Sequence, residues 1–481
     1  MRDKLYGNKL LDKRCAAQDE QFNLIFAIAV AIKGVLLVLT GSMYDKLGTL
    51  TTRLLGSVIF LSGSLMIAFS KPAIPYVLYP AVLCVMYGGF FILMTNMQLG
   101  NLLKRGRNTL ICIMNGAFDS SAFVLLLIKV AYEAGISLKA SFLTISAIYS
   151  ICILSTFLWL PRQFILDPLP DDFHLTICSS CKRNHGDYAI EVKSDLEISN
   201  INETQTQDPN EESGETVEST DDNAPNTPGD SPQPFSVVIQ SPMYWTSVLW
   251  FSSTHLRLMF FLGNFNSWIT NLTKNNAQNV SMYTTVFSFM LFAAVIMGPL
   301  SGPMLDRRTT APIGSLAFKL EKIRHFIPMF YLNTGLGVLL SACAAIPVLE
   351  LQYFTFVVFV LHRTFNYGPA SAFLAQAFPS QHFGKLYGIM FTTGAIVSLL
   401  QYPLFIWIKG PLRNDSMWVH IILICLAAMS IVHPINVWLY CRTNASRIRM
   451  DSKYSKVKDM HRETNHIQQN VGNANNITSM Q

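Results

Sequence analysis

Two short stretches of this 481-residue chain share one pattern and decide how the rest is interpreted. They are Gly41-Ser-Met-Tyr-Asp45-Lys46-Leu-Gly48 and Gly302-Pro-Met-Leu-Asp306-Arg307-Arg308. Each begins with a glycine at the end of an apolar stretch, followed by three residues, an aspartate and a basic residue. After the first copy, Arg53 begins the next apolar stretch. Glycine lets helices approach closely in a membrane. We expect each aspartate to meet the positive end of the following helix and to pair with its basic neighbour. Two copies indicate a duplicated unit.

The composition places this unit in a membrane protein. Hydrophobic residues make up 51% of the chain and charged residues 14%, whereas soluble domains carry about 25% charged residues. A soluble chain of this length would form roughly three domains of ~150 residues with charged outer faces. The net charge of +6 is small and is not gathered in a basic stripe, which argues against a nucleic-acid partner. The composition therefore disfavours a soluble enzyme and a nucleic-acid-binding protein.

Eleven stretches are long and apolar enough to cross a bilayer, since about 20 apolar residues span its core as a helix. They lack the alternating pattern of β-barrel strands. The fold predicted from them is an all-α polytopic membrane protein. The stretches are residues 21–40, 53–70, 74–101, 108–132, 139–160, 244–270, 281–305, 325–345, 351–378, 383–408 and 418–440.

These stretches form two membrane halves separated by a segment of different composition. Residues 21–160 hold five spans and residues 244–440 hold six. Between them, residues 161–243 carry 16 acidic and 4 basic residues, a charge of −12 that leaves +18 for the rest. We expect this acidic segment and the polar tail, residues 441–481, to be disordered. Residues 1–20 form a separate N-terminal segment.

The lysines and arginines predict the orientation. One set of alternate loops, which includes the central loop and the tail, contains 22 of them, and the opposite set contains 5. The first set is therefore predicted to be cytoplasmic. This places residues 1–20 outside, although they carry five positive charges. Either the rule is overridden here or a helix before the first span is missing.

Longer motifs resemble the solute carrier 43 family of the major facilitator superfamily. The paired motif is similar to the loop motif that follows helices 2 and 8 of the twelve in that superfamily. The resemblance implies two six-helix halves, with eleven spans visible here and the first helix of the family absent. The more specific matching stretches are Thr95-Asn-Met-Gln98-Leu-Gly-Asn101, Met114-Asn-Gly-Ala-Phe-Asp119-Ser-Ser, Tyr132-Glu-Ala-Gly-Ile-Ser-Leu-Lys139-Ala-Ser and Ala377-Phe-Pro-Ser-Gln-His-Phe-Gly-Lys385-Leu-Tyr-Gly.

The resemblance implies a plasma-membrane transporter and not an enzyme. The branch of the family most similar to this chain implies equilibrative transport of purine nucleobases such as adenine, guanine and hypoxanthine, by alternating access. The sister branch implies sodium-independent transport of large neutral amino acids, and a truncated, non-transporting membrane protein is a third alternative. No phosphate-binding G-x-x-x-x-G-K-[ST] motif is present. The expected partners are a small-molecule substrate and the lipid bilayer, with no cofactor and an open oligomeric state.

Polar side chains inside the spans are the candidates for the substrate pathway, because they are costly in a membrane. Asp119 is the one clearly intramembrane acid in the sequence. Asp119 can pair directly with Arg363, or each can have its own local partner, and both alternatives remain open. Arg257 with His255 is a candidate gate or interhelical pair. A flat, uncharged base would be held by aromatic rings and amides. Candidates of these types are Asn96, Gln98, Asn115, Phe118, Ser120, Phe365 and Tyr367.

Modification and metal signals are weaker. Asn271, Asn279 and Asn414 begin sequons on the predicted outer side and are candidate glycosylation sites. The stretch His174-x3-Cys178-x2-Cys181-x3-His185 has zinc-ligand types, but it lies in the acidic loop, which favours solvated thiols. No metal site is predicted.

Overall fold

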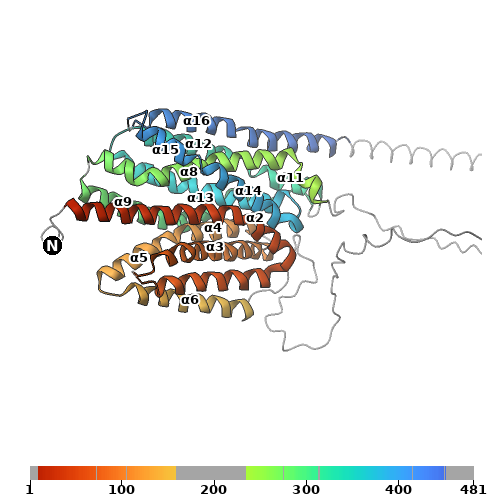
Figure 1. The fold of residues 1–481 in the computed structure, drawn as a ribbon. Coiled ribbons are helices and arrows are strands. Elements are labelled where there is room, and N and C mark those ends of the chain that lie inside the picture. Colours follow the sequence, from red (N-terminus) through yellow and green to blue (C-terminus); the bar gives the residue numbers. More distant parts are fainter. Residues whose placement is uncertain are drawn as a thin grey trace, which may run out of the picture. The chain divides into compact units, whose positions relative to one another are not determined.

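A computed structural model describes residues 9–71, 73–103, 106–158, 234–274, 276–312, 315–413, 415–448 and 450. Every regular element in these ranges is a helix, which confirms the all-α prediction (Figure 1). The elements are α2 Lys9–Ala68, η1 Pro75–Val77, α3 Leu78–Met97, η2 Gln98–Leu102, α4 Arg107–Ser120, α5 Ala122–Glu133, α6 Leu138–Leu158, α7 Phe235–Ile239, α8 Pro242–Leu272, α9 Ala277–Phe292, α10 Ala294–Leu305, α11 Leu316–Arg324, α12 Ile327–Ala345, α13 Leu351–Ala377, η3 Ser380–His382, α14 Phe383–Ser398, α15 Gln401–Lys409 and α16 Met417–Ser430.

Six helical segments in the described ranges are long and apolar enough to cross a membrane, and a bent pair makes a seventh. The pair is Gln278–Phe292 with Ala294–Leu305, which bends by 41°. The helices α8 and α13 are 31 and 27 residues long, but their polar side chains keep them out of this set. The six segments are Ile28–Ala68, Pro75–Leu102, Arg107–Glu133, Leu316–Ala345, Ser380–Lys409 and Met417–Ile448.

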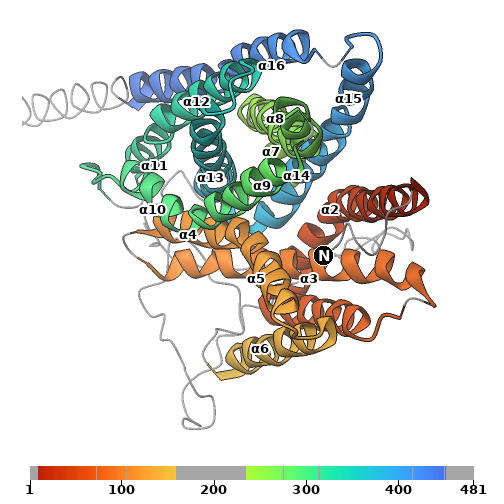
Figure 2. The same ribbon diagram turned by 90° about the vertical axis from the view of Figure 1, so that its left-hand side faces the viewer.

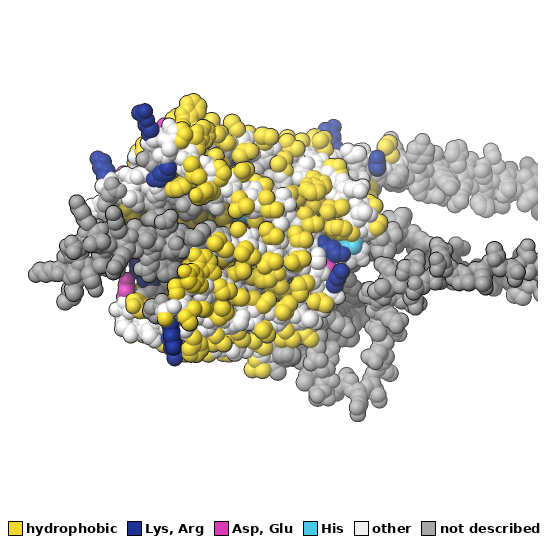
Figure 3. All heavy atoms as spheres, viewed as in Figure 1, with side chains coloured by type: hydrophobic (Ala, Val, Ile, Leu, Met, Phe, Trp, Pro, Cys, Tyr) yellow, Lys and Arg dark blue, Asp and Glu magenta, His cyan; other side chains and the backbone are white. Residues whose placement is uncertain are grey.

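The surface of these helices suits a bilayer. Hydrophobic side chains cover the middle of the face seen in Figure 3, and lysines and arginines gather toward its two ends. Val58, Ile151 and Ile296 are each more than 60% exposed. Large exposed apolar surfaces are rare on soluble monomers, so this band is where lipid contacts the protein.

The first two predicted spans are joined in one element. Residues 21–40 and 53–70 both lie on α2, which is interrupted only at Gly48, where φ is 74° and ψ is −177°. Residues other than glycine rarely adopt this positive φ. Glycine thus allows a sharp turn in place of the expected loop.

The prediction of disorder is wrong at two edges. Residues 234–243 contain α7 and the start of α8, where Val238 is buried and the Phe235 ring lies 5.5 Å from the His382 ring. The last helix continues to Ile448, and Cys441 on it is buried. Apolar side chains that find a core hold both segments in helices. The remainder of the predicted acidic loop and tail lies outside the described residues.

The two halves, α2–α6 and α8–α16, meet along two helix crossings. In these crossings α2 packs against α14, and α4 packs against α10 and α13 (Figure 2). Small residues bring the backbones together: a Cβ at Gly116 would lie 2.5 Å from the Ala294 carbonyl oxygen, and one at Gly298 would lie 2.8 Å from that of Cys112. Close glycine-mediated contact is typical of helix packing in membranes.

Candidate substrate site and its closure

The Asp45 carboxylate binds the beginning of a helix in the opposite half. Its Oδ1 accepts a hydrogen bond from the Gly384 backbone N–H at 2.8 Å, and its Oδ2 accepts one from Lys385 N–H at 2.8 Å. These amides belong to the first turn of α14, whose N-cap residue His382 makes no side-chain capping bond. First-turn amides have no acceptor within their own helix, and the positive helix end favours a carboxylate. Asp45 on α2 is therefore the cap of α14.

The Asp306 carboxylate makes the equivalent contact from the C-terminal half to a helix of the N-terminal half. Its Oδ1 accepts from the Asn108 backbone N–H at 3.2 Å, and its Oδ2 accepts from Thr109 N–H at 2.8 Å. The Thr109 hydroxyl donates a third bond to Oδ2 at 2.6 Å. These groups begin α4, whose N-cap Gly106 has no side chain with which to cap it. We call the two contacts the Asp45 clamp and the Asp306 clamp.

The clamps correct one expectation about the repeated motif. Each carboxylate was expected to meet the following helix and to pair with its basic neighbour, Lys46 or Arg307. Instead both reach across to the other half, where uncapped amides are available. The ion pairs within the described ranges are Lys129–Glu133 and Arg363–Asp119. Neither motif aspartate is paired in this way.

Three predicted residues hold the turn at Gly48 in place. Arg53 donates from Nε to Thr156 Oγ1 at 3.0 Å and from Nη1 to Asn96 Oδ1 at 2.6 Å. Gln98 accepts from the Tyr44 hydroxyl at 2.8 Å through Oε1, and its Nε2 donates to Thr49 Oγ1. Asn96 and Gln98 are thus bound to α2 beside the Asp45 clamp, and they are not brought together with Asp119.

Asp119 and Arg363 meet in an ion pair that joins the two halves. Arg363 Nη2 on α13 lies 2.9 Å from Asp119 Oδ1 on α4, with side-chain exposures of 17% and 2%. Among the described residues, Asp119 Oδ2 and Arg363 Nε have no hydrogen-bond partner. Lys33 of α2 is half-buried and interacts electrostatically with both charges. The pair thus retains one free acceptor and one free donor.

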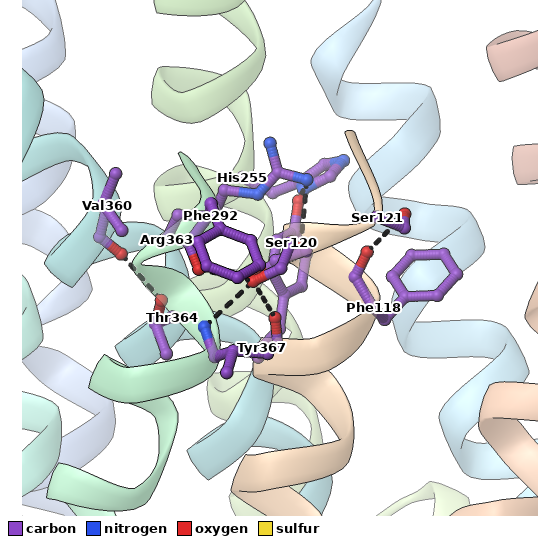
Figure 4. A network of polar contacts seen from close by, with 12 residues as sticks. Phe118, Ser120, Ser121, His255, Phe292, Val360, Arg363, Thr364 and Tyr367 are labelled. Carbon is purple, nitrogen blue, oxygen red and sulfur yellow. Dashed lines mark hydrogen bonds and ion pairs between the residues drawn. The ribbon is translucent and has the colours of Figure 1, made fainter. Parts of the chain in front are cut away.

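Tyr367 and His255 continue this group. The Arg363 guanidinium lies 5.9 Å from the centre of the Tyr367 ring. The Tyr367 hydroxyl and His255 Nδ1 form a hydrogen bond of 3.0 Å, in which either can donate. Figure 4 shows Arg363 and Tyr367 on α13 beside His255 of α8 and Ser120 of α4. The group therefore takes side chains from both halves.

Further aromatic rings pack against His255 and Tyr367. Phe251 stacks on His255 at 5.4 Å, and Phe391 lies 4.5 Å from Phe251 and 4.1 Å from Tyr387. Phe90, from the other half, lies 6.0 Å from Phe391. The sequence analysis did not single out these three phenylalanines and this one tyrosine. The spacing of Tyr387 and Phe391 places both rings on one face of α14 but does not single them out in the sequence.

The other predicted pathway residues mostly support helix packing. Asn115 Nδ2 donates to the Ile111 carbonyl of its own helix at 2.9 Å. Ser120 donates to the Phe292 carbonyl at 3.0 Å and accepts from Val295 N–H at 2.9 Å, across the bend between α9 and α10. Phe118 contacts Phe90 edge to face, and Phe365 is buried.

The remaining expectations have separate outcomes. Arg257 and His255 are not a pair, since Arg257 donates to the Leu423 carbonyl of α16 while His255 bonds Tyr367. Asn271 lies in the last turn of α8, and Asn279 lies on α9. Asn414 and the stretch from His174 to Cys181 and His185 lie outside the described residues. No group of metal-binding side chains occurs within the described ranges.

Comparison with known proteins gives the family. The Major Facilitator Superfamily pattern matches residues 15–402. The chain is 36% identical to equilibrative nucleobase transporter 1 of Bos taurus, over 92% of this chain and 88% of that protein. It is 25% identical to large neutral amino acids transporter small subunit 3 of Homo sapiens, over 92% of this chain and 85% of that protein.

A solved structure of a bacterial homologue of the iron transporter ferroportin, in an outward-facing state, aligns over 86% of this chain and 89% of that one, with 12% identity and a TM-score of 0.49. The superfamily match and the nucleobase transporter relative each cover most of the chain. The chain belongs to the major facilitator superfamily and, within it, to the solute carrier 43 family.

Proposed function

We propose that the protein is a facilitative transporter of purine nucleobases such as adenine, guanine and hypoxanthine. The observation that carries this proposal is the 36% identity to a nucleobase transporter across 92% of the chain. Both relatives named above are transporters, so the reaction is movement across a membrane and not catalysis. Large neutral amino acids are the alternative substrates, on the weaker similarity of 25% identity.

The chemistry of the central group supports a substrate that both donates and accepts hydrogen bonds. Asp119 and Arg363 neutralise each other and leave free one acceptor, Asp119 Oδ2, and one donor, Arg363 Nε, while Lys33 adds one positive charge that interacts with both. A purine edge carries both N–H donors and ring-nitrogen acceptors. The stacked rings of Tyr387 and Phe391, with Phe251 tilted against Phe391, supply aromatic partners for its flat face. A zwitterionic amino acid would instead need a partner for each of its two charges.

The clamps support alternating access. Both link the halves at the end of the helices where α4 and α14 begin. The Asp119–Arg363 pair links them in the middle of the span Arg107–Glu133 and in the middle of α13. Opening the clamped end requires each aspartate to leave its helix terminus. In this proposal, the substrate exits or enters there once both clamps release.

We place the protein in the plasma membrane with the clamped end, the central loop and the C-terminus in the cytoplasm. The support is the excess of lysine and arginine in these segments. An epitope tag after Gln481 is expected to be reached by antibody only after the cells are permeabilised. Staining of intact cells would reverse the orientation. A mobility shift on glycosidase treatment would test the three predicted sequons.

Uptake by cells that express the full chain tests the substrate. We expect saturable, sodium-independent uptake of labelled adenine that unlabelled guanine and hypoxanthine inhibit and leucine does not. Uptake of leucine without adenine would favour the amino-acid alternative. Uptake of neither, with the protein at the cell surface, would contradict both.

Two variants connect uptake to the ion pair. Because removing one partner leaves a buried charge uncompensated, we expect Asp119→Asn and Arg363→Gln each to lower adenine uptake by about tenfold or more. Lys129→Gln is the matched control, since its pair with Glu133 is 3.9 Å long with side chains 55% and 64% exposed. Exposed pairs contribute little, so this variant should transport normally. Normal uptake by both site variants would show that the pair is dispensable.

A further inference from the structure

Lys33 lies on the face of α2 that packs into the protein. Ala29, one turn before it, is 1% exposed, and Leu37 and Thr40, one and two turns after it, are 3% and 0% exposed. Residues at this spacing share one face of a helix. Leu37 belongs to the same buried cluster as Phe391. Lys33 is therefore on the side of α2 that faces the central rings and not on the side that faces lipid.

The backbone next to Lys33 is held against α14, and the other side of α14 contacts α8. The Thr392 hydroxyl of α14 donates to the Gly34 carbonyl at 2.7 Å. Two residues further along α14, a Cβ at Gly394 would lie 3.6 Å from the His255 ring of α8. This turn of α14 thus lies between the two helices, and it brings the Lys33 segment of α2 close to the central group.

The charge of Lys33 has no counter-ion of its own. Its ammonium interacts electrostatically with Asp119, Arg363 and His255. Within the described ranges, Asp119 forms its ion pair with Arg363, and Lys33 forms none. Lys33 does not bond Asp119 Oδ2 either, since that atom has no hydrogen-bond partner there. A charge inside a membrane span is costly and marks a functional site by default. Lys33 therefore offers a substrate charged N–H donors beside the ion pair.

The edges of purine bases differ in a way that an ammonium group can distinguish. Guanine and hypoxanthine carry a 6-oxo group beside ring nitrogen N7, so this edge presents two acceptors, whereas adenine presents the N7 acceptor and an amino donor. A cationic donor binds the first edge and meets another donor in the second. Asp119 Oδ2 can accept from both classes, through the N1–H of an oxopurine or through the amino group of adenine.

We propose that Lys33 is the residue that selects 6-oxopurines, by donating to their O6 and N7 atoms while the base lies at the central group. This inference rests on the proposed function, and it assigns one edge of the transported base to one side chain. Lys33 then contributes to the binding of guanine and hypoxanthine and not to the binding of adenine.

Two matched pairs of bases, which differ at the 6-position, test this role. Inhibition constants of hypoxanthine and adenine, and of guanine and 2,6-diaminopurine, are measured against uptake of labelled adenine by cells that express the full chain. Lys33→Met keeps the length of the side chain and removes its donors. We expect it to raise the constants of the two oxopurines about tenfold or more and to leave those of the two aminopurines unchanged. The ratio within a pair does not depend on how much protein reaches the surface.

Three further variants separate substrate selection from a structural role. Lys33→Arg keeps a cationic donor and should retain the ratio of the unmodified protein. Lys33→Gln keeps an uncharged donor and should change the ratio less, in the same direction as Lys33→Met, so it provides the test where Lys33→Met does not reach the surface. Lys129→Met is the matched control, because the side chain of this second intramembrane lysine is 55% exposed and lies 3.9 Å from Glu133. It should leave all four constants unchanged.

The outcomes separate this inference from the proposed function. If the unmodified chain takes up adenine, then an equal rise for both classes of purine in Lys33→Met, or no rise for either, would overturn the role of Lys33 alone. Loss of the ratio in Lys33→Arg would also overturn it. If the unmodified chain takes up none of the bases, the proposed function fails and this inference fails with it.

Discussion

The two copies of the repeated motif perform the same task with different contacts. Asp45 accepts two hydrogen bonds, from the backbone N–H groups of Gly384 and Lys385. Asp306 accepts three hydrogen bonds, two from backbone N–H groups and one from the Thr109 hydroxyl. In both, a carboxylate from one half caps an otherwise uncapped helix of the other. The repeat thus produces two reciprocal contacts across the interface, of unequal strength.

The Asp306 clamp has more hydrogen bonds, but the glycine of the Asp45 clamp has the less adaptable neighbour. A Cβ at Gly41 would overlap the backbone carbonyl of Gly384, whereas one at Gly302 would overlap the Thr109 side chain. The Thr109 side chain can rotate away, with loss of its hydrogen bond to Asp306, but a backbone carbonyl within a helix cannot. The Asp45 clamp therefore depends more on close backbone packing, and the Asp306 clamp more on hydrogen bonds.

Removing both carboxylates should have the largest effect. Hydrogen bonds to charged groups contribute about 1.5–3 kcal/mol each, so Asp45→Asn with Asp306→Asn should strongly favour the form open at the clamped end. Cys112 is a natural reporter, because its thiol is buried on α4 against Gly368 of the other half. We expect its maleimide labelling, followed by peptide mass spectrometry, to accelerate about a hundredfold.

Cys343, buried within the C-terminal half, is the control for this measurement. Its labelling should not change, because α12, which carries it, packs against α13, α16, α10 and α8 of its own half. Parallel acceleration at Cys112 and Cys343 would indicate unfolding, and unchanged labelling at both would show that the clamps do not hold this end closed.

Replacing each motif glycine with alanine should weaken the Asp45 clamp more than the Asp306 clamp. Overpacking typically costs about 1–3 kcal/mol, and the Gly384 backbone has less freedom to move than the Thr109 side chain. We expect Gly41→Ala to accelerate Cys112 labelling about tenfold or more, and Gly302→Ala to do so less. Equal effects would show that backbone contact does not distinguish the copies.

The single aspartate variants should rank by their number of hydrogen bonds. Asp306→Asn removes a carboxylate with three donors and Asp45→Asn one with two. The extra bond also goes to a charged group and is expected to contribute about 1.5 kcal/mol or more, which is roughly tenfold or more faster labelling of Cys112 in Asp306→Asn than in Asp45→Asn. A larger effect from Asp45→Asn would refute the ranking.

Thr109→Val should have the smallest effect and make the copies alike. Valine keeps the shape beside Gly302 but lacks the hydroxyl that donates to Asp306. We expect labelling of Cys112 to accelerate by about tenfold, the effect of losing one bond to a charged group. In the Thr109→Val background, Asp306→Asn should add no more than Asp45→Asn does. Labelling indistinguishable from the unmodified protein would mean that this hydroxyl contributes nothing to the clamp.

The sequence predicts the helices well because apolar stretches of membrane length have few alternatives. It also identifies the repeat, the candidate pair of Asp119 and Arg363, and Tyr367 as one of several candidate pathway residues. It does not predict that Asp45 binds amides 339 and 340 residues away, because that contact depends on the register between α2 and α14. For the same reason Asn96 and Gln98 appear as substrate candidates until Arg53 and Tyr44 are seen to bind them.

The aromatic rings around the pair were missed for a different reason. Phe90, Phe251 and Phe391 are indistinguishable in sequence from the many phenylalanines that face lipid or core. Only their convergence from α3, α8 and α14 sets them apart. A one-dimensional pattern shows which face of a helix a ring occupies but not which other helix that face meets.

Counterflow in proteoliposomes tests the central claim most directly. The purified chain is reconstituted without an ion gradient, and the vesicles are preloaded with unlabelled adenine or leucine. The account predicts that labelled adenine accumulates transiently above its equilibrium level in adenine-loaded vesicles and not in leucine-loaded ones, and that Asp119→Asn greatly reduces this overshoot. No overshoot with adenine, or an overshoot only with labelled leucine in leucine-loaded vesicles, would contradict it.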